Sequence, residues 1–176
     1  MKSYPNLLVL LHWILVPAIL IALFMGNDIA SLSNDLDLKV DRLKVHMFAG
    51  LFIGVLFVIR LIIKMRTTPV EPLKESENSP LMNKLALITH RVLYVLVFLI
   101  VLTGIAMSAQ INLLEIIQLG GTLPERLSDL PARRAHGILT TSFAILILLH
   151  SLAALYHHFI LKDGIFSRMW FSKVKK

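Results

Sequence analysis

The sequence predicts an all-α fold, a transmembrane four-helix bundle that occupies residues 1–176 as one domain with both termini in the cytoplasm. Apolar residues make up 56% of the chain and its mean hydropathy is +0.75, whereas soluble domains contain about 45–50% apolar residues. Four apolar stretches are long enough to cross a bilayer as helices, each of which needs about 17–25 residues. The basic residues are concentrated in alternate connecting segments, which indicates the orientation of the bundle.

The first predicted helix covers residues 7–26, LLVLLHWILVPAILIALFMG. A secretory signal peptide is the alternative interpretation of an apolar stretch so close to the N-terminus. The stretch is preceded by a single basic residue, Lys2, it exceeds the usual apolar region of about 7–15 residues, and His12 and Pro17 interrupt it. These features favour a membrane-spanning helix.

Three further apolar stretches complete the predicted bundle, at residues 45–63, 92–110 and 135–161. The segment 67–90 is polar and contains three prolines, so it is predicted to be a loop. The segment 111–134 contains LLEIIQLGG, which predicts a short interfacial helix ended by the two glycines.

The distribution of charge predicts which side of the membrane holds the termini. If both termini and the connection from Arg60 to Arg91 lie on one side, that side carries twelve of the 18 Lys and Arg residues. The opposite side carries the other six, together with seven of the 11 acidic residues. Since basic residues are enriched in cytoplasmic segments, the side with the termini is predicted to be cytoplasmic.

Composition also excludes several function classes. The net charge of +7 is explained by the cytoplasmic segments, and no basic helix with interleaved aromatic residues indicates nucleic-acid binding. The chain contains no cysteine, which excludes disulfides, iron–sulfur clusters and thiolate ligation of haem.

The predicted helix 135–161 carries four of the chain's seven histidines. His136 and His150 are fourteen residues apart, which is a rise of about 21 Å and about 40° short of four turns, so both imidazoles lie on nearly the same face. Ionisable side chains inside a membrane helix are costly and are therefore functional candidates. Two imidazoles at two depths indicate two stacked metal or haem sites.

The direction of each helix assigns two more histidines to these depths. His12 lies about 8 Å inside the first helix from the cytoplasmic side, and His150 lies about 12 Å inside the last. His46 and His136 each begin a helix on the outer side. The sequence thus predicts an inner pair, His12 with His150, and an outer pair, His46 with His136. Two imidazoles on opposite faces of a porphyrin form the bis-histidine ligation of haem electron carriers.

Zinc is a weaker alternative, because each pair lacks the third and fourth protein ligands that zinc sites use. A bundle without a cofactor would require the placement of five histidines to be a coincidence. His90 and His158 are interpreted as interfacial side chains, the first because it is too shallow and the second because it points about 80° away from His150. His157 lies only about 20° from the His150 face, so it is a candidate to contact a ligand docked beside the inner haem.

Two glycines follow His46 at intervals of one helical turn, Gly50 and Gly54. Small residues with this spacing are typical of close helix packing. On the face of a haem ligand they would also let a flat macrocycle lie against the backbone, so both glycines are candidate cofactor contacts.

These residues resemble the bacterial cytochrome b561 family, which includes the cytochrome b subunits of hydrogenases and formate dehydrogenases. The resemblance rests on LHW near the N-terminus, on His46, on the spacing of His136 and His150, and on the closing pattern LH-x6-HH-F-x2-KD. It covers essentially the whole chain. It implies a multi-pass protein of the bacterial inner membrane with two b haems, held by the inner and outer histidine pairs.

The resemblance further implies a membrane quinone as redox partner. In a standalone member similar to this chain, the activity would be oxidation of superoxide at the outer face with reduction of ubiquinone, and His157 would lie at the quinone site. The alternative is a membrane anchor and electron-conduit subunit for a separate dehydrogenase or soluble cytochrome. The lack of a large outer domain favours the standalone enzyme.

Basic residues near the outer histidines provide a physical reason to expect an anionic donor. Four of them flank His46 and His136: Arg42, Lys44, Arg133 and Arg134. Cations around a cofactor edge raise the encounter rate of a small anion such as superoxide. The alternative is that Arg133 and Arg134 pair with Asp129, Glu125 or lipid phosphates.

Overall fold

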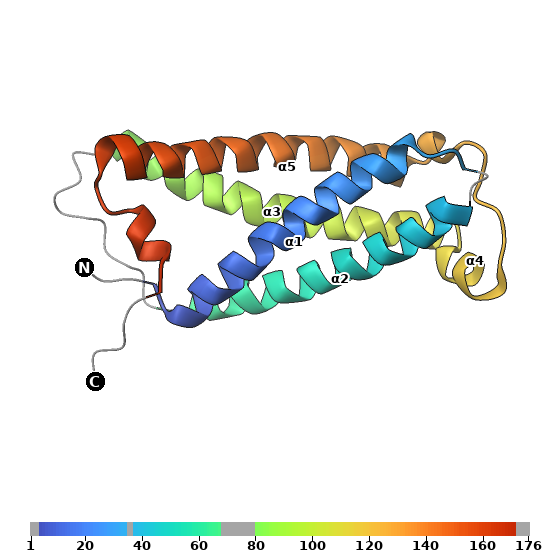
Figure 1. The fold of residues 1–176 in the computed structure, drawn as a ribbon, viewed down its shortest axis with the longest axis horizontal. Helices are drawn as coiled ribbons and strands as arrows, with labels where there is room; N and C mark the ends of the chain where they lie inside the picture. Colours follow the sequence, from blue (N-terminus) through green and yellow to red (C-terminus); the bar gives the residue numbers. More distant parts are fainter. Residues whose placement is uncertain (1–3, 35–36, 68–79, 172–176) are drawn as a thin grey trace.

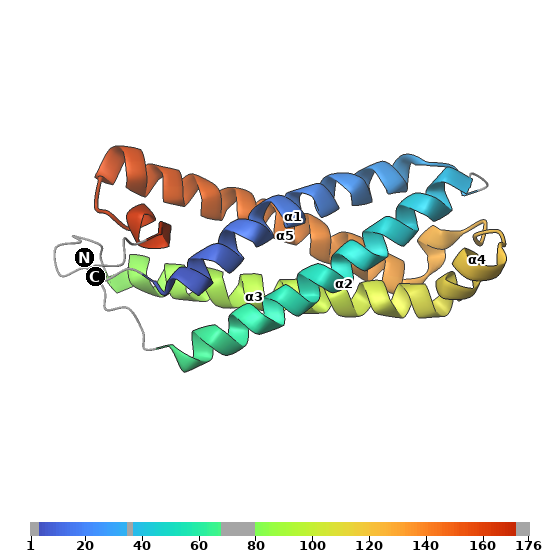
Figure 2. The same ribbon diagram turned by 60° about the horizontal axis from the view of Figure 1, so that its bottom comes forward.

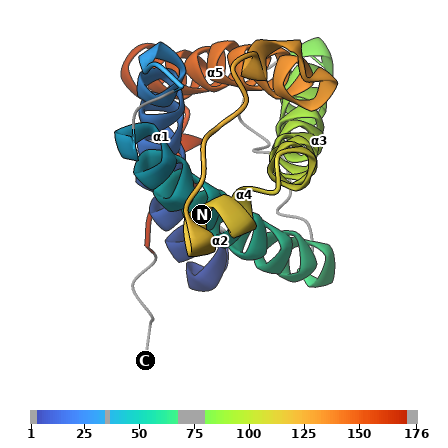
Figure 3. The same cartoon turned by 90° about the vertical axis from the view of Figure 1, so that its right-hand side faces the viewer.

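The computed structural model describes residues 4–34, 37–67 and 80–171, which form helices joined by short connections. Four of the helices have the length and apolar composition needed to cross a membrane. These are α1 (Asn6–Ser31), α2 (Asp37–Arg66), α3 (Pro80–Gln110) and α5 (Pro131–Tyr156). Successive long helices run in opposite directions (Figure 1), and the end-on view shows them arranged around the bundle axis (Figure 3). The prediction of an all-α bundle with four membrane spans is confirmed.

The bundle has two distinct ends. At one, called the terminal end here, α1 begins and the short helix η3 (Phe166–Met169) is the last helical segment (Figure 1). At the other, the α4 end, the helix α4 (Leu113–Leu119) lies across the bundle (Figures 2 and 3). The two ends of the described chain therefore lie on one side, as predicted; that this side faces the cytoplasm stays a prediction.

All four long helices extend beyond the predicted apolar stretches. α2 begins at Asp37 rather than at residue 45, and α3 begins at Pro80 rather than at residue 92. The added turns mix charged and polar residues with apolar ones, so composition alone did not separate them from the connecting segments. The prediction that residues 80–90 belong to a loop is therefore wrong. Pro80 begins the helix, a position where its missing N–H has no partner to lose. The remainder of the predicted loop, residues 68–79, lies outside the described residues.

The short helix predicted between the third and fourth spans is confirmed as α4. Asn112 adopts a left-handed conformation with φ of 50°, which separates α4 from the end of α3. Gly120 ends the helix at φ of 78°, a conformation that glycine adopts without steric cost. A single 3-10 turn, η1 (Leu127–Asp129), then leads into α5.

One cluster of buried apolar residues lies at the α4 end, where residues of α1, α2 and α4 meet. This cluster consists of Ile29, Leu43, Ile111, Leu113 and Leu123. Along the rest of the bundle many large apolar side chains point outward; Phe24 is 75% exposed and Ile138 is 68% exposed. Such side chains are suited to lipid contact, because lipid tails are as apolar as leucine.

Candidate haem and electron-transfer site

The outer histidine pair is brought together by α2 and α5. The ring centroids of His46 and His136 are 6.4 Å apart and the ring planes meet at 79°. A metal bound between two imidazoles holds each nitrogen at about 2.0–2.1 Å, so the nitrogens lie about 4 Å apart and the ring centres somewhat farther. The observed separation fits one metal between the two rings. Among the described residues, no group of three or more His, Cys, Asp or Glu side chains is placed to hold a metal ion. A pair of imidazoles suits a metal whose remaining ligands come with it, as iron does in haem.

The ring of His136 is held in one orientation by α3. Its Nδ1 lies 3.1 Å from the carbonyl oxygen of Ile100 and 3.1 Å from Oγ1 of Thr103. The Thr103 hydroxyl donates to the carbonyl oxygens of Leu99 at 2.9 Å and Ile100 at 3.0 Å, so it accepts from Nδ1. Nδ1 therefore carries the proton, and Nε2 has a free lone pair for a metal.

Thr103→Val is expected to weaken the outer haem site without destroying it. Nδ1–H of His136 loses one of its two acceptors, so the imidazole becomes a poorer electron donor and its orientation is less restricted. Loss of such supporting contacts costs about 10–100-fold in metal affinity. We expect faster haem loss and a higher reduction potential for one haem, measured by haem transfer and by redox titration.

Ser142→Ala is the matched control, because the Ser142 hydroxyl also bonds back to its own helix, at 2.9 Å from the Ile138 carbonyl, but lies away from the histidines. A Thr103→Val protein with the haem affinity and potentials of the parent would show that Thr103 does not support His136.

A cavity of about 1820 Å³ opens beside the outer pair and is lined by all four long helices and by α4. Its lining includes both outer histidines. Two glycines make room for their rings: a Cβ on Gly26 would lie 3.3 Å from Cε1 of His46, and a Cβ on Gly104 would lie 3.5 Å from Cε1 of His136. Nδ1 of His46 is buried without a hydrogen-bond partner in the described structure. The space, the imidazoles and the glycine faces together fit a large planar group such as haem. Gly26, Gly104 and Thr103 were not predicted from the sequence.

The two glycines that sequence reasoning did select occupy different surroundings. A Cβ on Gly50 would meet nothing within 4 Å, and Gly50 lines the cavity, as a cofactor contact should. A Cβ on Gly54 would lie 3.3 Å from both methyl groups of Val101, so Gly54 is where α2 packs closely on α3. Gly54 is not among the residues that line the cavity. Its placement supports the helix-packing interpretation, and its part in cofactor binding stays a prediction.

Three histidines, rather than two, gather at the inner depth. His12 lies within electrostatic range of both His90 and His150. The rings of His90 and His150 are in edge contact, with centroids 5.2 Å apart and planes at 80°. The interpretation of His90 as too shallow is wrong, because α3 begins at Pro80 and ten residues of helix place His90 about 15 Å along it. Nδ1 of His90 lies 2.6 Å from the carbonyl oxygen of Ala86 on its own helix.

A cation also lies near this inner group. Nη1 of Arg60 on α2 donates to the carbonyl oxygen of Leu8 on α1 at 2.5 Å. The same guanidinium is an electrostatic neighbour of His12 and His90. In the sequence, Arg60 was identified only as one of the basic residues that predict the orientation of the bundle. In the structure its hydrogen bond joins the two helices that carry His12 and His46.

His157, the candidate quinone-site residue, lies at the terminal end, seven residues or about two helical turns beyond His150. It begins η2 (His157–Leu161), a π-helical turn that follows α5 directly. Its Nδ1 lies 2.5 Å from Oδ2 of Asp163. Neighbouring His158 is exposed and its ring packs at 4.8 Å from that of Phe166, in agreement with its interpretation as an interfacial side chain.

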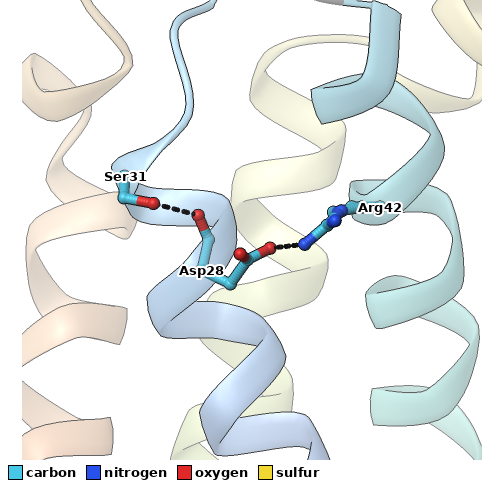
Figure 4. A network of polar contacts seen from close by, with 3 residues as sticks. All are labelled: Asp28, Ser31 and Arg42. Carbon is cyan, nitrogen blue, oxygen red and sulfur yellow. Dashed lines mark hydrogen bonds and ion pairs between the residues drawn. The ribbon is translucent and has the colours of Figure 1, made fainter.

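The four basic residues predicted to attract an anionic donor have different surroundings in the structure. Arg42 forms an ion pair with Asp28 (Figure 4). Arg134 donates to the carbonyl oxygen of Ser128 at 3.1 Å and lies 3.9 Å from the Asp129 carboxylate, which supports the alternative interpretation of this residue. Lys44 is exposed and is not part of the cavity lining, whereas Arg133 lines the cavity that contains both outer histidines.

A further cation at the cavity, Lys39, was not selected from the sequence. It is 6% exposed, and its Nζ donates to the Leu32 carbonyl at 2.6 Å and to Oδ1 of Asn34 at 2.7 Å. Nδ2 of Asn34 in turn donates to the carbonyl oxygens of Pro124 and Glu125, each at 2.9 Å. This network joins the α1–α2 connection to the segment before η1. Lys39 and Arg133 are the two basic residues that line the cavity.

Paired histidines inside a four-span bundle are typical of membrane cytochromes of the b type. Residues 3–172 match the family of prokaryotic cytochrome b561. A protein of Yersinia pestis described as probable superoxide oxidase CybB is 30% identical over 177 residues, which cover 96% of this chain and 96% of that protein. The chain therefore belongs to the prokaryotic cytochrome b561 family, a family of multi-pass membrane oxidoreductases of electron transport that bind haem b.

Proposed function

We propose that this protein is a superoxide:ubiquinone oxidoreductase of the bacterial inner membrane, with two b haems and with its termini in the cytoplasm. The observation that carries the proposal is the pair of His46 and His136, whose ring centroids lie 6.4 Å apart beside a large cavity. A second group of histidines lies nearer the terminal end. The similarity to a probable superoxide oxidase over nearly the whole chain supports the choice of donor.

The residues divide into three roles. His46 and His136 would hold the outer haem, and His12 and His150 the inner one. Bis-histidine haem supplies one-electron transfer and leaves no open position on iron, so it conducts electrons without binding oxygen. At about 1.5 Å per residue, the fourteen residues between His136 and His150 separate the two ligand depths by about 21 Å, much of the hydrocarbon thickness. His157, beyond the inner group, would contact the quinone.

The decisive experiment combines haem quantification with turnover on the detergent-purified full chain. We expect two b haems per chain in the reduced-minus-oxidised spectrum, and reduction of a short-chain ubiquinone when superoxide is supplied. Two haems without superoxide-driven turnover, together with co-purification of a stoichiometric soluble redox protein, would instead support the electron-conduit subunit. A folded preparation without haem would contradict the proposal entirely.

Arg133→Gln is expected to slow capture of superoxide. Glu115 and Glu125 also line the cavity, so its lining carries no excess positive charge and any steering depends on Lys39 and Arg133 individually. Lys39 is occupied by two hydrogen bonds, which leaves Arg133 as the main candidate. We expect kcat/KM for superoxide to fall about tenfold at low ionic strength and to become less sensitive to salt.

Arg126→Gln provides the matched control, because Arg126 is an exposed residue of the segment that leads into α5 and is not part of the cavity lining. An equal loss of rate in both variants would attribute the effect to overall charge. An Arg133→Gln protein with unchanged kcat/KM and salt dependence would remove Arg133 from the donor path.

A further inference from the structure

The end of α5 departs from regular helix at the residue proposed to contact quinone. After Tyr156 the chain forms the π-helical turn η2, and Lys162 then adopts a left-handed conformation with φ of 52°. π-helical turns are rare and occur frequently at functional sites. His157 keeps α-helical dihedrals, the wider turn changes the path of the chain after it, and the left-handed residue then sends the chain back toward the bundle (Figure 1). As a result, Asp163 comes to face His157.

His157 and Asp163 form a close and largely buried pair. Nδ1 of His157 lies 2.5 Å from Oδ2 of Asp163, and each side chain is 13% exposed. The other carboxylate oxygen, Oδ1, accepts the backbone N–H of Ile165 at 3.1 Å. The carboxylate is therefore held on both sides. Because an ionised carboxylate only accepts hydrogen bonds, the proton of the pair lies on Nδ1, and Nε2 is the ring nitrogen available to a ligand.

The segment that carries Asp163 is anchored to the start of α1, next to the inner haem ligand. Nε1 of Trp13 donates to the carbonyl oxygen of Met169 at 2.7 Å. The Trp13 ring also packs edge-on against Phe166 and Trp170, with centroids 6.4 and 5.7 Å away. Trp13 directly follows His12, and their rings are 5.5 Å apart. The His157–Asp163 pair is thus fixed at the same end of the bundle as the inner histidines.

We infer that Asp163 is the positioning residue for proton delivery to quinone by His157; this inference rests on the proposed function. Two superoxide anions each lose one electron and leave as dioxygen, and the quinone takes up these two electrons and two protons to become the hydroquinone. For each proton, His157 acts as the imidazolium, with one proton on Nδ1 and a second on Nε2. The Nε2–H bond breaks, an O–H bond forms at a quinone carbonyl oxygen, and the neutral imidazole with its proton on Nδ1 remains. Nε2 is then reprotonated from water on the cytoplasmic side, while Nδ1–H remains bound to Asp163.

The pairing has the arrangement of a general acid oriented by a carboxylate, in which the carboxylate fixes the tautomer and does not itself transfer the proton. Asp163→Asn tests this directly. The amide oxygen can retain the bond from the Ile165 N–H, which places the amide NH₂ group against Nδ1 of His157. The imidazole must then accept at Nδ1 and carry its proton on Nε2 in the neutral form, so the tautomer is reversed while the fold of the segment is kept.

The experiment follows reoxidation of the prereduced, haem-loaded full chain after rapid mixing with a short-chain ubiquinone. His157→Ala and Asp163→Asn are each expected to slow the maximal rate by about 100-fold, within the range for positioned proton donors, with a much smaller change in the quinone concentration at half-maximal rate. The double variant is expected to be no slower than His157→Ala, since the two residues act as one unit. Asp163→Glu is expected to restore part of the rate. His158→Ala serves as the matched histidine control.

The outcomes separate this inference from the proposed function. Slow reoxidation in His157→Ala with a normal rate in Asp163→Asn overturns the role of Asp163 and leaves the quinone site in place. Normal rates in both variants overturn the inference together with the quinone site at His157. Additive losses in the double variant contradict a single unit. If Asp163→Asn alters haem content or either haem potential, Asp163 is a structural residue and the inference is wrong.

Discussion

His12→Ala is expected to lower the haem content of the purified protein from two b haems per chain to one, whereas His90→Ala is expected to keep both. This comparison is necessary because the ring centroids of His90 and His150 are only 5.2 Å apart. His90 is therefore an alternative to His12 as the inner ligand. Each variant removes one imidazole, and the two imidazoles lie at the same depth of the bundle. Each is therefore the control for the other.

The surroundings of the two histidines favour His12. His12 lies on a turn of α1 whose neighbours Leu11 and Leu15 are buried, at 6% and 2% exposure. The adjacent Trp13 is fixed by its bond to Met169, so this turn is rigid. His90 is an exposed residue whose Nδ1 bonds to the carbonyl of Ala86 on its own helix. A ligand held by surrounding structure loses less side-chain entropy on binding a metal than an exposed one.

Redox difference spectra and pyridine haemochrome quantification measure the result, and circular dichroism verifies that each variant keeps its helices. His150→Ala is expected to behave as His12→Ala does, because it removes the opposite axial ligand. Retention of two haems in His12→Ala with loss of one in His90→Ala would reassign the inner pair to His90 and His150. Loss of both haems from a folded His12→Ala protein would show that the two sites are not independent.

The arrangement of the helices was largely predictable from the sequence, because lipid imposes a simple rule on chain segments. A span must be long, apolar and helical, so the number of spans and their alternating direction followed from composition. Depth within a span follows from the residue count alone, and this brought His46 and His136 together correctly. Helix ends were not predictable in this way, because the turns of α2 and α3 beyond the predicted stretches mix charged and polar residues with apolar ones. The error about His90 has this cause.

The residues that support the site were harder to predict, because their roles depend on which helices are neighbours. Gly26 and Gly104 are ordinary glycines in the sequence; only the packing of α1 beside His46 and of α3 beside His136 gives them a function. Thr103 lies in an apolar stretch, and the hydroxyl of a threonine inside a helix most often bonds to a carbonyl oxygen of its own helix. Asp163 is the last residue of the pattern LH-x6-HH-F-x2-KD, so the resemblance to the family did include it. Its contact with His157 depends on the π-helical turn, which has no sequence signature.

His46→Ala is expected to separate the two halves of the proposed reaction. With one outer ligand removed and its partner His136 still held by Thr103 and Ile100, the outer haem is expected to be lost or to exchange readily. Electrons from superoxide would then have to cross about 20 Å without an intermediate carrier. We expect superoxide-driven ubiquinone reduction to fall at least about 100-fold, the loss produced by misplacing a reacting group. The inner haem, once reduced chemically, is expected to be reoxidised by ubiquinone at the parental rate.

The contrast with His157→Ala makes this result specific. His157→Ala keeps both haems and slows reoxidation by quinone, whereas His46→Ala keeps the quinone reaction and blocks entry of electrons. Opposite patterns from two histidines at opposite ends of the bundle are the result expected when electrons enter at the α4 end and leave at the terminal end. If His46→Ala retained full superoxide-driven turnover, electrons would enter elsewhere, and the cavity beside His46 and His136 would have no part in the reaction.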